Sequence, residues 1–246
     1  MPERRRFFSG LGTALAALTL PHRSALGADF DEARKRLLAE IERDLHDTAA
    51  STGIGSLSPA VRHALETVPR ERFIPPTFAA RAYENRPLPI GHGQTISQPF
   101  IVALMTELLD PKPTDLVLEI GTGSGYQAAV LAACVRKVFS IEIVAPLAQQ
   151  ARAALDAAGV RNVETRVGDG YLGWPDAAPF NSIIVTAAPD HMPPALLAQL
   201  AAGGRMVLPV GALFDQELLL VRKEADGRAV TRRTIGVRFV PLTRER

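Results

Sequence analysis

The sequence predicts an α/β fold in which helices cover both faces of a mostly parallel sheet that ends in antiparallel strands. After residue 100, short apolar segments rich in β-branched residues alternate with segments of helical period, a pattern typical of parallel sheets. A glycine-rich turn follows the first of these strands, at residues 121–125. Near the C-terminus, Asp226 and Gly227 separate two strand-like segments, which indicates a hairpin. With 246 residues, 47% of them apolar, the chain is long enough for one such domain with appendages.

Residues 1–28 are predicted to be an export leader that takes no part in the fold. Arg4, Arg5 and Arg6 precede an apolar stretch at 7–20, and a small-residue site follows at 25–28. Adjacent arginines before such a stretch resemble a twin-arginine signal, and the alternative is a basic, disordered tail. We therefore expect a periplasmic protein, with the cytoplasm as the alternative location.

Composition excludes several classes of protein. A single cysteine, Cys134, rules out a disulfide framework and a multi-cysteine zinc site, and the histidines have no metal-ligand spacing. No apolar run is long enough to cross a bilayer, so no stable membrane insertion is expected. Outside the leader the net charge is −1, which does not favour a nucleic-acid partner. We expect no bound metal.

The segment 29–99 is predicted to hold two helices and an active-site loop. Apolar side chains fall on one face of a helix over residues 29–50, and Ser58 with Pro59 marks the start of a second helix that runs to about Val68. Residues 87–99 are rich in Pro and Gly and have no sustained period, so we expect a long irregular loop. Its apolar Ile90 and Ile96 favour a functional loop over a disordered one.

The segment 100–246 is predicted to be the nucleotide-binding core. After a helix that ends at Asp110, we expect parallel strands at 116–120, 138–142, 163–167, 182–186 and 205–210. The helices between them are predicted at 126–134, 145–158 and 194–200. Antiparallel strands are then expected at 217–223 and 229–235, followed by a last strand at 237–242.

The glycine-rich turn is the first candidate ligand site. It stands where a strand becomes a helix, so the backbone can turn sharply and offer free N–H groups to a ligand. A dinucleotide fingerprint would need a third glycine at the position of Tyr126, and an acidic residue, Glu119, stands just inside the strand. The turn consists of Gly121, Thr122, Gly123, Ser124 and Gly125.

Carboxylates at successive strand ends narrow the choice of ligand. Glu142 ends the second strand and can accept both hydroxyls of a ribose, and Asp169, beside Gly170, can reach an adenine amino group. Together with Glu119 these acids disfavour a pyrophosphate, because its negative charges would be repelled. They favour a nucleoside that carries positive charge, such as S-adenosylmethionine. The alternative is that these carboxylates only cap helices.

Residues 61–243 resemble the protein-L-isoaspartate O-methyltransferase family, S-adenosylmethionine enzymes that repair damaged aspartyl and asparaginyl sites. The most specific match is the loop Leu88–Pro99, whereas the glycine turn within 117–127 is shared by many methyltransferases. Further matching stretches lie at 68–73, 168–170, 183–189, 208–211 and 238–243. The resemblance implies a Rossmann-like methyltransferase fold with a seven-stranded sheet. The leader and the longer helix before Ser58 depart from the family pattern.

The resemblance also implies the chemistry. The family's substrate is an L-isoaspartyl residue in a damaged protein, whose free α-carboxyl has a pKa of about 3.3–3.7 and needs no general base. By resemblance Ser97 is the active-site residue. Its hydroxyl can orient the acceptor carboxylate by a hydrogen bond. The alternative is that Ser97 only forms a turn. Thr95 and Ile96 would line the methionine end of the cofactor, and Thr243 would close the site. A monomer is expected.

Two other functions remain open at this stage. The same nucleotide-binding half could serve an oxidoreductase, which would bind a nicotinamide dinucleotide. A non-catalytic protein that binds S-adenosylmethionine is the second alternative, against which the intact Ser97 loop argues. The cytoplasm, where S-adenosylmethionine is made, is the usual location of the family.

Overall fold

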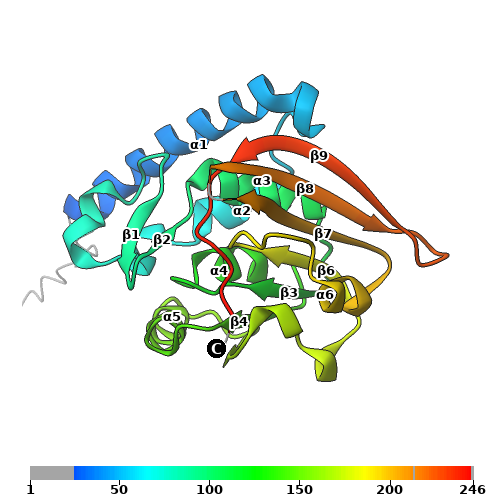
Figure 1. Cartoon of the computed structure of the whole chain (residues 1–246). Coiled ribbons are helices and arrows are strands. Elements are labelled where there is room, and N and C mark those ends of the chain that lie inside the picture. The colour runs from blue at the N-terminus through cyan, green and yellow to red at the C-terminus, as the bar shows by residue number, and fades with distance from the viewer. Residues whose placement is uncertain (1–24, 213, 245–246) are drawn as a thin grey trace, which may run out of the picture.

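The central feature is a seven-stranded sheet of order β5-β4-β3-β6-β7-β8-β9, seen in a computed structural model that describes residues 25–212 and 214–244 (Figure 1). Strands β3 to β7 pair in parallel, and β8 and β9 add an antiparallel end. This confirms the predicted fold class. The strands are β3 Leu116–Ile120, β4 Lys137–Glu142, β5 Val163–Val167, β6 Phe180–Val185, β7 Leu200–Ala212, β8 Asp215–Lys223 and β9 Ala229–Val237.

Alternating side chains of the strands pack into two separate apolar clusters, one on each face of the sheet. On β3, Val117 joins one cluster and Leu118 the other, because successive strand residues point to opposite faces. Side chains from α3 (Pro99–Leu109), α4 (Tyr126–Ala132) and α5 (Ala145–Ala157) belong to the first cluster. The second cluster takes in Leu196 of α6 (Pro194–Gln199) and Trp174, which lies beside the short helices η3 (Gly170–Leu172) and η4 (Pro175–Ala177).

The N-terminal segment packs over the first face with α1 (Ala25–Thr52) and α2 (Pro59–Thr67). Ser58 caps α2 as predicted, since its Oγ accepts a hydrogen bond from the Val61 N–H at 3.3 Å. Two short helices follow, η1 (Arg70–Phe73) and η2 (Pro76–Arg81). Helix α1 begins at Ala25, so the last four residues of the predicted leader are helical; the other residues of that leader, 1–24, lie outside the described residues.

The segment 87–99 corrects one prediction, because it contains a hairpin rather than an irregular loop. Its strands are β1 (Leu88–Gly91) and β2 (Gln94–Ile96), in which Leu88 pairs with Ile96. The turn between them places His92 and Gly93 at positive φ. Leu88, Ile90 and Ile96 are all buried, so burial of one apolar side stabilises a pairing that the Pro and Gly content concealed.

The predicted last strand at 237–242 is also wrong. Strand β9 ends at Val237, and the following chain crosses the carboxyl ends of the parallel strands (Figure 1). There it is held by a single bridge, in which Ala188 N–H donates to Val240 O and Leu242 N–H donates to Ala188 O, both at 2.8 Å. Pro241 lies between them and has no N–H to offer a ladder. We call residues 240–243 the C-terminal segment.

Two properties of the described residues concern ligands and membranes. None of the helices within the described ranges combines the length and apolarity that crossing a bilayer requires. Across the same residues, no three side chains of His, Cys, Asp or Glu gather in a way that could hold a metal ion.

Candidate active site

A pocket lies at the carboxyl ends of β3, β4 and β6, the edge at which parallel α/β sheets bind ligands. Four stretches from distant parts of the sequence line most of it: the end of the hairpin, the glycine turn, the end of β4 and the C-terminal segment. Their lining residues are 94–97, 120–124, 141–144 and 240–243.

Ten of the thirteen site residues predicted from the sequence line this pocket. They are Thr95, Ile96, Ser97, Gly121, Thr122, Gly123, Ser124, Glu142, Gly170 and Thr243. The other three, Glu119, Gly125 and Asp169, are adjacent to lining residues but are not part of the lining themselves.

The glycine turn has a conformation and a packing that require glycine. Gly121 adopts φ +94°, and a Cβ built there would lie 2.6 Å from Oγ1 of Thr186. The Thr186 hydroxyl in turn donates to Gly121 O at 2.6 Å. At the end of the turn, Gly125 has φ +86° and packs against Ala151 and Leu155 of α5. Gly125 therefore supports the turn from behind.

Glu142 joins the turn after β3 to the turn after β4. Its Oε2 accepts from the Gly123 N–H at 2.8 Å, and its Oε1 accepts from the Val144 N–H at 2.9 Å. The side chain is 6% exposed and lines the pocket. Each carboxylate oxygen can accept a second hydrogen bond, so Glu142 suits a pair of ribose hydroxyls.

Glu119 lies fully buried beneath the pocket. Its Oε2 accepts from the Ser140 hydroxyl, which is 2.6 Å from the hydroxyl of Thr122 in the lining. Its Oε1 has no hydrogen-bond partner. Burial, the largest effect, raises the pKa of Glu119 to about 8. Glu119 is therefore connected to the pocket through the hydroxyls of Ser140 and Thr122, and it does not line the pocket itself.

Asp169 has a structural role beside the pocket. Its Oδ1 accepts from the Tyr171 N–H at 2.8 Å and so caps η3. The next residue, Gly170, does line the pocket, and a Cβ there would come within 2.3 Å of the Ile120 side chain. By capping η3, Asp169 fixes the position of Gly170. The second carboxylate oxygen of Asp169 takes no part in this cap.

Arg70 is a residue for which the sequence indicated no role beyond its place in the 68–73 motif. It is fully buried, with Nη2 donating to Ser97 O at 2.7 Å and Nε donating to Ala82 O at 2.9 Å. Its Cζ lies 4.8 Å from the centre of the Tyr126 ring, and Nη1 has no partner. Burial lowers the pKa of Arg70 to about 10, so it stays charged at neutral pH.

The pocket fits a cationic nucleoside better than a dinucleotide. Among the described lining residues Glu142 is the only charged one, and the Glu119 carboxyl beneath has a buried oxygen without a partner. A pyrophosphate would meet the Glu142 carboxylate and no cation among the described lining residues, whereas a positively charged nucleoside would be attracted to that carboxylate. Glycine backbone at the start of α4 allows close approach of such a ligand.

A parallel sheet with an antiparallel end, a glycine turn after β3 and an acid at the end of β4 define an S-adenosylmethionine-dependent methyltransferase. The sequence pattern described as protein-L-isoaspartate(D-aspartate) O-methyltransferase matches residues 42–246. The chain belongs to this family.

Individual relatives agree with this assignment. Protein-L-isoaspartate O-methyltransferase 2 of Syntrophobacter fumaroxidans is 50% identical over 96% of this chain and 97% of its own. The enzyme of that name from a Polaromonas species is 54% identical over 85% of this chain and all of its own.

Solved structures show the same fold. A protein-L-isoaspartate O-methyltransferase superimposes with a TM-score of 0.72 at 29% identity, over 85% of this chain, which spans 65% of that structure. A Plasmodium falciparum structure has a TM-score of 0.71 at 22% identity, over 86% of this chain and 99% of its own. It is described as a putative protein-L-isoaspartate O-methyltransferase in complex with S-adenosyl-L-homocysteine, and at this identity it supports the fold alone.

Proposed function

We propose that this enzyme methylates the free α-carboxylate of L-isoaspartyl residues in damaged peptides and proteins. The observation that carries the proposal is the absence of a free base among the described residues of the pocket lining. Glu142 accepts two backbone hydrogen bonds, and Thr95 and Ser97, at the end of the hairpin, contribute hydroxyls. An alcohol or amine acceptor would need a base, whereas a main-chain carboxylate is already an anion.

The residues of the chain have separate roles in this reaction. S-adenosylmethionine, when bound, supplies a methyl group on a sulfonium that a carboxylate oxygen can accept. The Ser97 hydroxyl donates a hydrogen bond that orients the acceptor without neutralising it, and Arg70 holds Ser97 through its carbonyl. The buried Ile96 and the C-terminal segment exclude water from the pocket. Glu142 and the glycine turn hold the nucleoside.

The repair that follows needs no residue of the enzyme. In the methyl ester, the backbone amide nitrogen of the next residue attacks the ester carbonyl and expels methanol, which closes a succinimide. Water then opens the ring, and part of the product is normal aspartate. The enzyme therefore has only to form the ester.

Methyl transfer to matched peptides tests the proposal. One peptide carries L-isoaspartate, and its twin carries L-aspartate at the same position. With labelled methyl donor, we expect incorporation into the first peptide alone. S-adenosylhomocysteine should raise the Tm in a thermal shift, and a nicotinamide dinucleotide should not. Equal labelling of both peptides would contradict the proposal.

We also propose that residues 1–28 direct export and that the enzyme acts as a monomer. The basic start, the apolar stretch and the small-residue site support export. A pocket whose described lining comes from one chain is compatible with a monomer. Cell fractionation of the wild type and of the variant R5K/R6K tests the first point, because loss of the adjacent arginines should retain the protein in the cytoplasm. Light scattering tests the second.

A further inference from the structure

A second cavity opens directly onto the methyl-transfer pocket. It is a groove of about 910 Å³, and four residues line both spaces: Thr95, Ser97, Thr186 and Val240. An acceptor residue held at Ser97 would therefore have its neighbouring residues in this groove. The volume is near the upper end of ordinary ligand pockets, so it accommodates several residues of a polypeptide.

The groove has walls from three separate elements. Helix α1 forms one wall, β8 with β9 forms another, and the hairpin with the start of α3 closes the inner end. Phe214, immediately before β8, also lines the groove and is 83% exposed, so its ring offers apolar surface to whatever occupies the groove. The guanidinium of Arg238 lies over its ring, 5.7 Å from the centre.

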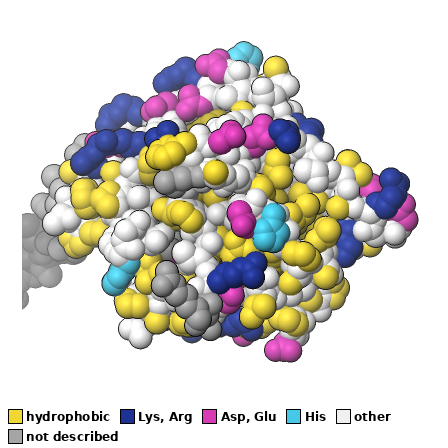
Figure 2. Space-filling view, in the orientation of Figure 1, with side chains coloured by type: hydrophobic (Ala, Val, Ile, Leu, Met, Phe, Trp, Pro, Cys, Tyr) yellow, Lys and Arg dark blue, Asp and Glu magenta, His cyan; other side chains and the backbone are white. Residues whose placement is uncertain are grey.

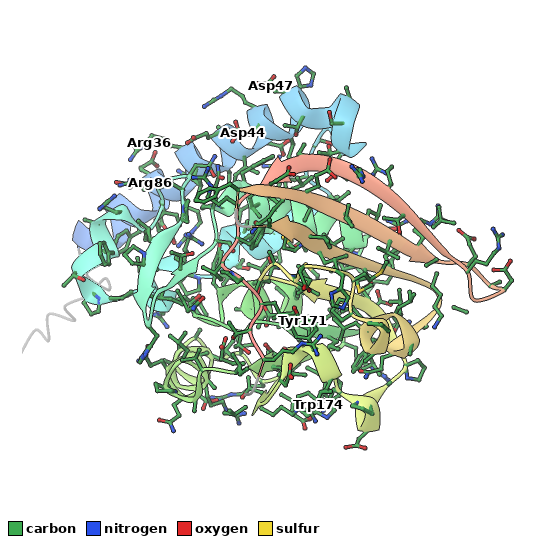
Figure 3. The ribbon with its side chains drawn as sticks, in the orientation of Figure 1. Arg36, Asp44, Asp47, Arg86, Tyr171 and Trp174 are labelled. Atoms are coloured by element: carbon green, nitrogen blue, oxygen red, sulfur yellow. The ribbon has the colours of Figure 1, made fainter. Side chains whose placement is uncertain are left out.

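Acidic side chains dominate the charge of this groove. Asp44 and Asp47 come from α1 (Figure 3), and Asp215 and Glu217 come from β8. Arg238 is the one cation among the described residues that line the groove. Figure 2 shows charged side chains gathered along α1 and just below it on this face of the molecule.

Most of this negative charge is not neutralised by the protein. Glu217 pairs with Arg233 at 2.8 Å, and Asp44 accepts from the neutral Asn85 amide at 2.7 Å. Among the described residues, Asp47 and Asp215 form no ion pair. Three carboxylates therefore face the groove without a cationic partner.

We propose that this groove binds the polypeptide on either side of the acceptor residue and selects segments that carry Lys or Arg. The inference rests on the proposed function, because it places the acceptor at Ser97. The acceptor brings a carboxylate, which the groove acids repel, and basic neighbours of the acceptor offset that repulsion. A segment with acidic neighbours would add to it. Phe214 supplies apolar contact that does not depend on the charge of the segment.

The experiment compares two L-isoaspartyl peptides that differ only in their neighbours, Lys in one and Glu in the other. At low ionic strength we expect kcat/KM to be about tenfold higher for the Lys peptide. In about 0.5 M salt the ratio should fall towards one, because exposed charges are screened. The D47N/D215N variant should reduce the ratio to about threefold with unchanged Tm, since both side chains are exposed. D176N, which removes an exposed acid on η4 outside the groove, is the matched control and should keep the full ratio.

Three outcomes separate the two proposals. Equal kcat/KM for the Lys and Glu peptides would overturn the groove inference and leave the methyltransferase proposal standing. A full ratio retained in D47N/D215N would also overturn it, because the selection would then come from elsewhere. If neither peptide is methylated while S-adenosylhomocysteine still raises the Tm, both proposals are overturned. F214A provides a further check: it should lower kcat/KM for both peptides by a similar factor.

Discussion

The Arg70 guanidinium donates from Nη2 to the main-chain oxygen of Ser97 at 2.7 Å, across 27 residues of sequence. The same side chain donates from Nε to Ala82 O and lies over the Tyr126 ring. One buried cation thus connects the end of the hairpin, the chain after η2 and the first residue of α4. In the proposed reaction Arg70 would act on the acceptor through Ser97, as a positioning residue.

Replacement of Arg70 should slow turnover without weakening the cofactor site. R70M removes the donors to Ala82 O, which is buried, and to Ser97 O, which is half-buried, so we expect a lower Tm and kcat reduced at least tenfold. R70K keeps the charge but cannot reach both carbonyls, and should recover part of the Tm and little of kcat. Titration with S-adenosylhomocysteine should give a Kd within about threefold of wild type. R72M, at an exposed position of η1, is the control; a kcat loss there as large as in R70M would contradict the role.

Replacement of Ser97 by alanine should lower kcat by about 10²-fold, because the acceptor loses the hydrogen bond that orients it. Binding of S-adenosylhomocysteine should persist, since the glycine turn and Glu142 are untouched. A labelled-methyl assay together with calorimetric titration measures both quantities. The exposed S56A variant should match wild type in each. Unchanged turnover in S97A would show that Ser97 is a turn residue only.

Glu142 should matter for cofactor affinity rather than for the acceptor. In E142Q an amide NH₂ replaces one of the two oxygens that accept from Gly123 and Val144, so one backbone N–H loses its partner. We expect the binding of S-adenosylhomocysteine to weaken by about 1–3 kcal/mol of binding free energy, which raises its Kd, with KM for the peptide little changed. E66Q, at an exposed position of α2, serves as the control. An unaltered Kd in E142Q would argue against the ribose contact.

Buried Glu119 should make stability depend on pH. Its pKa is raised from 4.5 to about 8, so the folded state holds a proton that the unfolded state releases above pH 4.5. The contribution of Glu119 to the free energy of unfolding is therefore present in full below pH 4.5 and is lost as the pH rises towards 8. Wild type should therefore lose up to about 1.4 kcal/mol of unfolding free energy per pH unit over this range.

The E119Q variant isolates this effect. Because glutamine does not titrate, the extra slope between pH 5 and 8 should disappear in urea unfolding curves. E66Q should keep the wild-type slope, since its side chain is exposed. A wild-type slope in E119Q would mean that other groups cause the pH dependence.

Local patterns predicted much of the fold. Short apolar segments between segments of helical period predicted the strands of the sheet, and Ser58 predicted the start of α2, because both signals depend on neighbours a few residues away. The hairpin at 88–96 and the course of the chain after Val237 were predicted wrongly. The hairpin pairs locally, but its Pro and Gly content concealed the pairing, which burial of one apolar side stabilises. The chain after Val237 is held by a long-range bridge between Pro241 and Ala188.

The sequence by itself determined the class of fold, the glycine turn and the Ser97 loop, since each is written in residue types at short spacing. Only the tertiary structure decided that Glu119 lies beneath the pocket with a raised pKa and that Arg70 reaches Ser97. The groove beside the pocket likewise exists only where α1 meets β8 and β9. Burial and hydrogen bonding depend on which distant residues fold together, and that proximity is not encoded in spacing along the chain.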